Sequence, residues 1–170
     1  MWLSTWINSQ KKAYYSATST AAVSAQTADW HLSSADIPDS EYQHHEISRK
    51  DRKLPSIPRS LKNAGYSLEY YYGGDADFTN MRSYLVSSGI EKIISDKDFP
   101  LSERTGKWGA QDHVLFQRLM KDLKEEKQEE PFLKLVQTSS SHEPFEVPFH
   151  RLDDKVLNSF AYADSCVEIS

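Results

Sequence analysis

The sequence predicts an α/β fold with a mostly parallel sheet flanked by helices. Two observations support this class. From residue 54 onward, segments with apolar residues at helical spacing alternate with short apolar or aromatic runs typical of strands, which is the pattern of α/β domains. In addition, a glycine-rich loop and a serine-rich loop each follow a predicted strand, where ligands meet open α/β sheets.

The predicted elements begin with a short helix. Pro58 fits its first turn and Gly65 its C-terminal end. The aromatic run YSLEYYY favours a strand after it, and Gly89 ends the next helix. In chain order we expect a helix over 54–66, a strand over 66–72, a helix over 78–89, a short strand over 90–95, a helix over 108–127, a strand over 131–139 and a helix over 151–167.

Three of these helices carry an apolar face. The faces are formed by Phe78, Met81, Leu85 and Val86, by Val114, Leu115, Leu119 and Leu123, and by Leu152, Val156, Phe160 and Ala163. Pro131 breaks the long helix. The run PFLKLVQTS after it is nearly continuously apolar, which predicts a strand buried on both faces.

Length and charge exclude several classes of protein. The 170 residues suffice for one domain with a core. A net charge of −5 argues against a nucleic-acid partner. The N-terminus is too short and polar for a signal peptide, and no run reaches the roughly 20 apolar residues of a membrane helix. Cys166 stands alone, so no internal disulfide can form. We therefore expect a soluble chain without a membrane segment, cytoplasmic by default.

The N-terminal part differs in composition from the rest. Residues 13–48 are rich in Ala, Ser, Thr, Gln and Asp and show no period of two or of 3.6. Few branched apolar residues are available there to anchor a core. We predict a low-order N-terminal segment over 1–48 and an α/β domain over 49–170.

Two loops carry the candidate chemistry. His142 follows the apolar strand, where an imidazole could donate a hydrogen bond to a phosphate or sulfate oxygen, or serve only as a loop residue bonded to a local carbonyl. The loop GGDAD offers glycines whose backbone N–H groups can approach an anion. Its carboxylates, Asp75 and Asp77, could hold a hard cation or simply form a turn.

Three other clusters favour ordinary structure. His44, His45 and Glu46 lack further ligands at zinc-site spacing. Asp112 and His113 fit the surface of the long helix. The serines of 139–141 lack the Gly-x-Ser-x-Gly elbow of a nucleophile.

Three stretches, LPSIPRSLKNAGYSLEYYYGGDADFTNM, WGAQDHVLF and TSSSHEPFEVPF, occur in an order that resembles the sulfatase-like phosphoglycerol transferases. These form the lipoteichoic acid synthase branch of the alkaline phosphatase superfamily. The resemblance covers residues 49 to 167 and implies part of a sulfatase-like sandwich. It also implies a bacterial, membrane-anchored parent with an extracytoplasmic catalytic domain, a divalent metal (typically manganese) and a threonine nucleophile.

The resemblance implies substrate-binding roles for particular residues. The histidine that contacts the substrate phosphate in the family corresponds to His142. Tyr72 stands where the family usually has a histidine, which leaves the substrate open, and Phe78 and Asn80 occupy the region of its usual Trp and Arg. The substrate-binding residues implied are His142, Tyr72, Gly73, Gly74 and Asp75.

The resemblance is incomplete at both ends. The family's nucleophilic threonine and first metal ligand lie upstream of LPSIPRSL, and its Asp-His metal pair lies downstream of NSFAYADSCV; we find no match for either. We therefore assign no catalytic residue and no metal ligand to this chain. We expect a fragment of a metal-dependent sulfatase or phosphoglycerol transferase, acting on cell-envelope phosphate or sulfate esters and inactive alone.

Two alternatives stay open. One is a non-catalytic module that binds an anion or a partner through the same loops. The other is a fragment that aggregates through its sheet edges, with YSLEYYY as the segment at risk. A frameshift would explain the incomplete pattern, because codons can be chosen for HHEIS and VEIS whose shifted frames encode family-like stretches. On that hypothesis residues 1–48 are out of frame, and sequencing the locus decides it.

Overall fold

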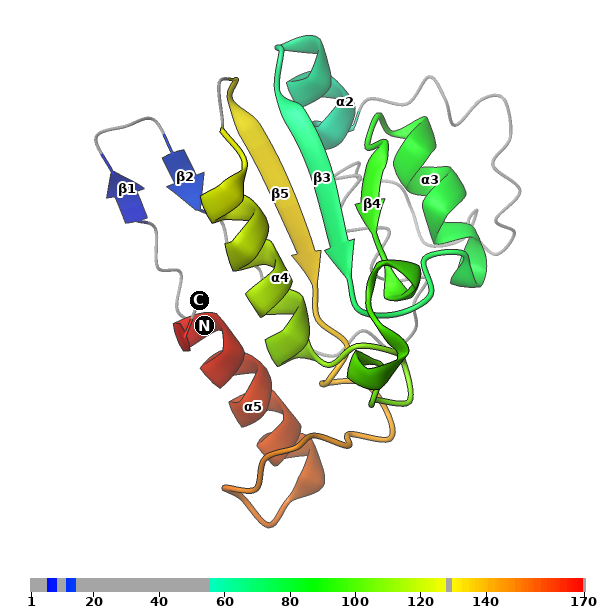
Figure 1. Cartoon of the computed structure of the whole chain (residues 1–170), viewed down its shortest axis with the longest axis vertical. Coiled ribbons are helices and arrows are strands. Elements are labelled where there is room, and N and C mark those ends of the chain that lie inside the picture. The colour runs from blue at the N-terminus through cyan, green and yellow to red at the C-terminus, as the bar shows by residue number, and fades with distance from the viewer. Residues whose placement is uncertain (1–5, 9–11, 15–55, 128–129, 170) are drawn as a thin grey trace, which may run out of the picture.

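The computed structural model describes residues 6–8, 12–14, 56–127 and 130–169 (Figure 1). Two short antiparallel strands, β1 (Trp6–Asn8) and β2 (Lys12–Tyr14), fall within the segment predicted to have low order. The rest of that segment lies outside the described residues, so its order and the boundary at residue 48 stay predictions.

Three parallel strands form the sheet that positions the candidate site (Figure 1). β3 (Ser67–Tyr72) is central, with β4 (Lys92–Ile94) on one side and β5 (Phe132–Gln137) on the other. Because both pairings are parallel, the carboxyl ends of the strands lie at one edge of the sheet. The predicted α/β class with a parallel sheet is confirmed.

Local sequence signals set the ends of the helices. The Ser56 side chain accepts a hydrogen bond of 3.3 Å from the backbone N of Arg59 and so caps the first helix. The helix ends near Gly65, whose φ of 85° is the left-handed conformation that glycine adopts without strain. In chain order the elements are α2 (Ile57–Asn63), the 3-10 turn η2 (Phe78–Asn80), α3 (Met81–Ser87), the 3-10 turns η3 (Asp96–Asp98) and η4 (Leu101–Glu103), α4 (Asp112–Glu125) and α5 (Lys155–Ile169).

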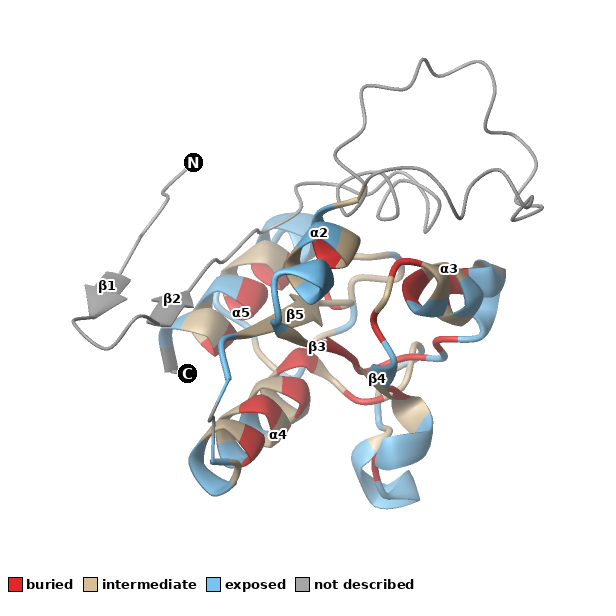
Figure 2. Cartoon of the chain, turned by 90° about the horizontal axis from the view of Figure 1, so that it is seen from above, coloured by how far each residue is buried: buried red, intermediate tan, exposed pale blue. Residues whose placement is uncertain are grey.

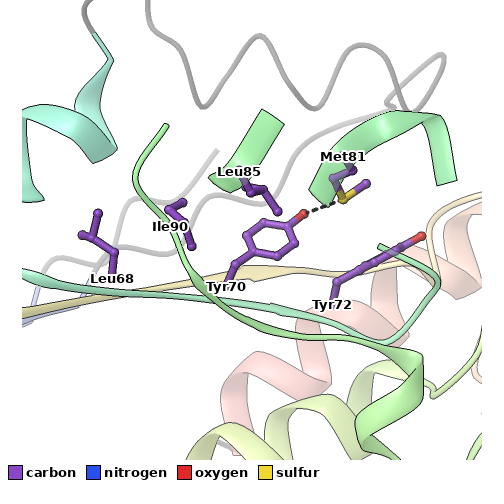
Figure 3. Packing of buried hydrophobic residues seen from close by; sticks show 6 residues of the cluster. All are labelled: Leu68, Tyr70, Tyr72, Met81, Leu85 and Ile90. Atoms are coloured by element: carbon purple, nitrogen blue, oxygen red, sulfur yellow. Dashed lines mark hydrogen bonds between the residues drawn. The ribbon is translucent and has the colours of Figure 1, made fainter. Parts of the chain in front are cut away.

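Helices cover both faces of the sheet and bury one hydrophobic cluster on each (Figure 2). Alternate residues of β3 supply both clusters, as the pleat of a strand requires. Tyr71 faces α4 and packs with Leu115 and Leu119. The cluster on the other face, drawn in Figure 3, consists of Leu68, Tyr70, Tyr72, Met81, Leu85 and Ile90. The result is a three-layer sandwich.

The most buried strand is β3 and not β5. All residues of β3 after Ser67 are buried, whereas every residue of β5 is only half-buried. The prediction that PFLKLVQTS is buried on both faces is met only in part: Leu133 and Leu135 pack against one cluster and Val136 against the other, but all three are half-buried. Within the described residues β5 pairs on one side only, which leaves a sheet edge beside it. YSLEYYY is the central strand, paired on both sides, so it is not the edge that the aggregation alternative requires.

Two predicted helix faces also differ from the structure. Val86 and Phe78 are each 49% exposed, while Met81 and Leu85 are buried as predicted. In α5 the buried residues include Asn158, Ser159, Tyr162, Ala163 and Cys166, and Val156 is exposed. The side chain of Asn158 turns inward because its oxygen accepts hydrogen bonds from backbone N–H groups of the preceding loop. A period of apolar residues does not reveal such polar anchors.

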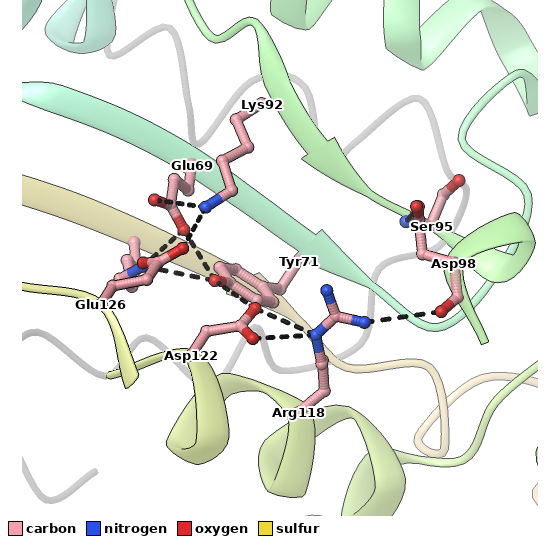
Figure 4. A network of polar contacts seen from close by, with 9 residues as sticks. Glu69, Tyr71, Lys92, Ser95, Asp98, Arg118, Asp122 and Glu126 are labelled. Carbon is pink, nitrogen blue, oxygen red and sulfur yellow. Dashed lines mark hydrogen bonds and ion pairs between the residues drawn. The ribbon is translucent and has the colours of Figure 1, made fainter. Parts of the chain in front are cut away.

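A network of charged side chains lies between the sheet and α4 (Figure 4). The side chain of Lys134 on β5 is 4% exposed and pairs with Glu69 of β3 and with Glu126 after α4. The hydroxyl of Tyr71 lies 2.6 Å from Glu69 and 3.0 Å from Asp122. These contacts join two strands and a helix.

In the part of the chain that is described, no helix has the length and apolar character needed to span a bilayer.

Candidate functional site

Backbone contacts with the segment before α4 hold the loop that follows β3. The backbone N of Ala110 donates a hydrogen bond of 2.8 Å to the carbonyl oxygen of Gly73. A Cβ atom at position 73 would lie 2.1 Å from the carbonyl oxygen of Ala110, and one on Gly74 would lie 2.7 Å from that of Trp108. Both positions therefore require glycine. Within the described residues, these glycines let the loop lie close to the backbone of Trp108 and Ala110.

The two carboxylates of this loop have different surroundings. Oδ1 of Asp75 accepts a hydrogen bond of 2.8 Å from the backbone N of Asp77, which closes a turn. Asp77 itself pairs with Lys97 at 2.7 Å and with Arg82 at 2.8 Å. Hydrogen bonds from these two cations lower the pKa of Asp77. Two cations thus already compensate Asp77, whereas Asp75 is exposed and closes the turn.

Tyr72 lies at the end of β3, where the resemblance implied a substrate contact. Its side chain is 7% exposed and packs in the cluster that faces α3 (Figure 3). Burial raises the pKa of Tyr72 to about 12, and the charges of Asp75, Asp112 and Asp96 add to the shift. The phenol therefore stays protonated at neutral pH and can donate a hydrogen bond. Unlike an imidazole, it cannot supply a positive charge.

His142 lies half-buried on the loop after β5, and its ring contacts Trp108. The two ring centroids are 4.7 Å apart, with the planes at 73°. Nδ1 of His142 lies 3.1 Å from the carbonyl oxygen of Glu143. The same oxygen accepts a hydrogen bond of 2.9 Å from Nε1 of Trp108. Trp108 thus contacts both predicted loops, through its backbone at Gly74 and through its ring at His142.

Asp112 joins the start of α4 to the same serine-rich loop. Its side chain is fully buried and accepts hydrogen bonds from the backbone N of Ser139, at 2.9 Å, and from the backbone N and hydroxyl of Ser140. Burial raises the pKa of Asp112 to about 6, against the opposing effect of these hydrogen bonds. The interpretation of Asp112 as helix surface was wrong, because its carboxylate satisfies loop N–H groups that the sequence does not place beside it.

The neighbouring His113 makes a third connection. Its Nδ1 lies 2.6 Å from the hydroxyl of Tyr162 on α5, and burial raises the pKa of Tyr162. The start of α4 therefore contacts the loops after β3 and β5 and also α5. The hydroxyl of Ser140 donates a hydrogen bond to Asp112, so this serine has a structural role. His44, His45 and Glu46 lie outside the described residues.

The described residues do not form a metal site. No three His, Cys, Asp or Glu side chains among residues 56–127 and 130–169 group closely enough to hold an ion. Oδ1 of Asp96 is buried and has no hydrogen-bond partner in this part of the chain, but no further ligands accompany it. The residues described here therefore do not fit the divalent metal that the resemblance implies.

Sequence reasoning placed both candidate loops at the carboxyl edge of the sheet but missed what holds them. Trp108 bonds to Glu143 at one end of the His142 loop and Asp112 to Ser139 at the other. Both residues lie in the segment expected to start a helix. The one available signal was the stretch WGAQDHVLF, whose glycine and aspartate precede the regular helical pattern.

One family model and two solved structures resemble this chain. The family model described as "Sulfatase" matches residues 8–167, and so extends upstream of residue 49, where comparison of motifs finds no match. A lipoteichoic acid synthase, LtaP from Listeria monocytogenes, is 26% identical with a TM-score of 0.72, over 85% of this chain and 38% of its own. A protein of the alkaline phosphatase superfamily from Vibrio parahaemolyticus is 29% identical with a TM-score of 0.59, over 72% of this chain and 33% of its own. The chain thus spans between a third and two fifths of these structures.

Proposed function

The chain belongs to the sulfatase family, and from this membership we propose that its described part supplies the anion-binding loops of a phosphoryl or sulfuryl transfer site. The proposed substrates are phosphate or sulfate esters of the bacterial cell envelope. The similarity to a lipoteichoic acid synthase supports this substrate class. In the same proposal the parent enzyme is anchored in a membrane and carries its catalytic domain outside the cytoplasm.

One observation carries the proposal. The loop with Gly73 and Gly74 and the loop with His142 follow adjacent parallel strands, and Trp108 contacts both. Open α/β sheets bind ligands at this edge. An imidazole N–H of His142 can donate a hydrogen bond to an ester oxygen, and the phenol of Tyr72 supplies a second, neutral donor at the end of β3. These donors bind and orient an oxyanion.

Catalytic turnover requires more than binding of the anion. A divalent metal would stabilise the charge that develops on the transferred group, but the described residues do not group three ligands for it. We therefore propose that this chain binds the anion without turning it over. The same observation favours the second candidate function, a non-catalytic anion-binding module.

The experiment compares matched histidine variants. We expect inorganic sulfate or phosphate to raise the unfolding temperature of the wild-type chain, since a ligand that binds only the folded state stabilises it. His142→Ala should abolish the protection. A hydrogen bond to a charged group is worth about 1.5–3 kcal/mol, which corresponds to a loss of roughly tenfold or more in affinity. His150→Ala is the control, because His150 is exposed in the same β5–α5 connection and its contact with the exposed carboxylate of Asp153 is a long one of 3.8 Å.

Two results would contradict the proposal. If neither anion protects the wild-type chain, or if both histidine variants retain the protection, the loops do not bind an oxyanion through His142. Hydrolysis of a chromogenic phosphodiester or sulfate ester by the purified chain with manganese would overturn the absence of turnover.

A further inference from the structure

We propose that Trp108 and Asp112 are positioning residues, which fix the orientation and the tautomer of His142 in the anion site. The proposal rests on the proposed function of His142 as the anion contact. The two residues lie four positions apart in the segment WGAQD. They hold opposite ends of the loop that carries the histidine, while the backbone between them contacts Gly73.

The contact of Trp108 determines which ring nitrogen of His142 is free. A carbonyl oxygen only accepts hydrogen bonds, so the 3.1 Å contact between Nδ1 of His142 and the oxygen of Glu143 requires the proton on Nδ1. Nε2 is then the nitrogen that can face a ligand. Nε1 of Trp108 donates 2.9 Å to the same oxygen, which has a second lone pair for it. Trp108 therefore holds the acceptor that selects the tautomer, and its ring packs against the imidazole as well.

Asp112 fixes the other end of the loop. Its carboxylate accepts from the backbone N of Ser139 and of Ser140, and the backbone N of His142 in turn donates 3.1 Å to the carbonyl oxygen of Ser139. Asp112 therefore positions the backbone of His142 through one intervening residue, Ser139. Full burial of Asp112 makes these hydrogen bonds less accessible to competing water.

The same segment sets the distance to the other loop. Ala110 donates to the carbonyl oxygen of Gly73, and a Cβ on Gly109 would lie 2.2 Å from that oxygen. Backbone packed this closely leaves little room for sliding. Both proposed anion-binding loops therefore contact the same short segment, residues 108–112. A site that must match a tetrahedral anion benefits from such preorganisation.

The test reads out the tautomer and the affinity separately. Nitrogen-15 spectra of the neutral imidazole should show Nδ1–H for His142 in the wild-type chain, with His142→Gln used to assign the signal. Trp108→Ala should shift the ring toward the Nε2–H form and weaken the binding of inorganic sulfate about tenfold. Sulfate is the probe because it does not titrate between pH 5 and pH 8. Trp108→Phe, which keeps a ring but lacks Nε1–H, should also release the tautomer while preserving the fold.

The loop contacts of Asp112 are tested in the same way. Asp112→Ala should speed the exchange of the amide hydrogens of Ser139 and Ser140 and weaken sulfate binding. Combining Trp108→Ala with His142→Gln should weaken it no further than His142→Gln does, because Trp108 acts through the histidine. Leu119→Ala is the control, since Leu119 lies two turns further along α4 in the core. It should lower the unfolding temperature without changing the tautomer or the affinity.

An Nε2–H tautomer in the wild-type chain, or an unchanged tautomer and unchanged sulfate affinity in Trp108→Ala, would overturn the positioning role. A wild-type chain that binds no sulfate refutes the proposed function, and the tautomer and exchange measurements then still decide whether Trp108 and Asp112 orient the histidine.

Discussion

The buried network of Figure 4 predicts that Lys134→Met costs about 3 kcal/mol of folding free energy. The Lys134 side chain is 4% exposed and that of its partner Glu69 is 9% exposed. Removing one member of a buried ion pair typically costs roughly 3–5 kcal/mol, because the other charge stays buried and uncompensated. Here Glu69 keeps Lys92 at 3.0 Å and the hydroxyl of Tyr71 at 2.6 Å. We therefore expect the lower end of that range.

A double-mutant cycle tests whether the cost comes from the pair. Glu69→Leu should destabilise for the same reason, whereas Glu69→Leu with Lys134→Met should cost less than either single change, since no buried charge is left without its partner. Urea unfolding at pH 7 in 0.1 M and 1 M NaCl gives the free energies. The control is Glu91→Gln, which breaks the exposed pair with Lys62 and should cost far less than Lys134→Met, and less still in salt.

Two results would refute this reasoning: a Lys134→Met variant within about 0.5 kcal/mol of the wild type, or single costs that simply add. The pH dependence is a further check. Burial alone would raise the pKa of Glu69, but hydrogen bonds from Lys134, Tyr71 and Lys92 bring it below the ordinary 4.5. A lowered pKa in the folded state gives stability that is present above 4.5 and is lost as the pH falls through the folded value. The cost of Lys134→Met should therefore shrink in acid.

Two further predictions concern the segment before α4. Burial raises the pKa of Asp112 from 3.8 to about 6, so its contribution to stability is present below 3.8 and is lost as the pH rises through about 6. Relative to the wild type, Asp112→Asn should gain about 3 kcal/mol between these two pH values, and urea unfolding across pH 4 to 7 that shows a constant difference would contradict this. Gly73→Ala brings a Cβ to 2.1 Å from the carbonyl oxygen of Ala110, so its unfolding temperature should fall more than that of Gly65→Ala, where no atom lies within 4 Å and only the positive φ adds strain. Equal shifts in the two thermal scans would refute the close contact.

The parts of the fold that depend on local signals could be predicted from the sequence. The helix over α2 follows from its proline and its terminal glycine, and the order of elements gives the parallel sheet. The burial of the strands could not be predicted in the same way. YSLEYYY and PFLKLVQ are both apolar, and only their order in the sheet makes β3 central and β5 an edge within the described residues. That order depends on pairing between distant segments.

The candidate site shows the same division. Glycines after one strand and a histidine after another mark the two loops, because open α/β sheets bind ligands at the carboxyl ends of their strands. Asp112 could not be recognised, since its partners Ser139 and Ser140 are 27 and 28 positions away. A lone aspartate in the first turn of a helix is ordinarily read as favourable to the helix dipole. Its burial under a loop is a tertiary fact that no local pattern encodes.

The way the loops are held also bears on the unusual Tyr72. A positive histidine in that place would contribute charge to the proposed anion site, and the phenol does not. Backbone contacts with Trp108, Gly109 and Ala110 hold the loop after β3, and the ring of Tyr72 also lies against Gly74. In the proposed anion site, a histidine at that position would therefore change the charge while the backbone contacts of the loop remain.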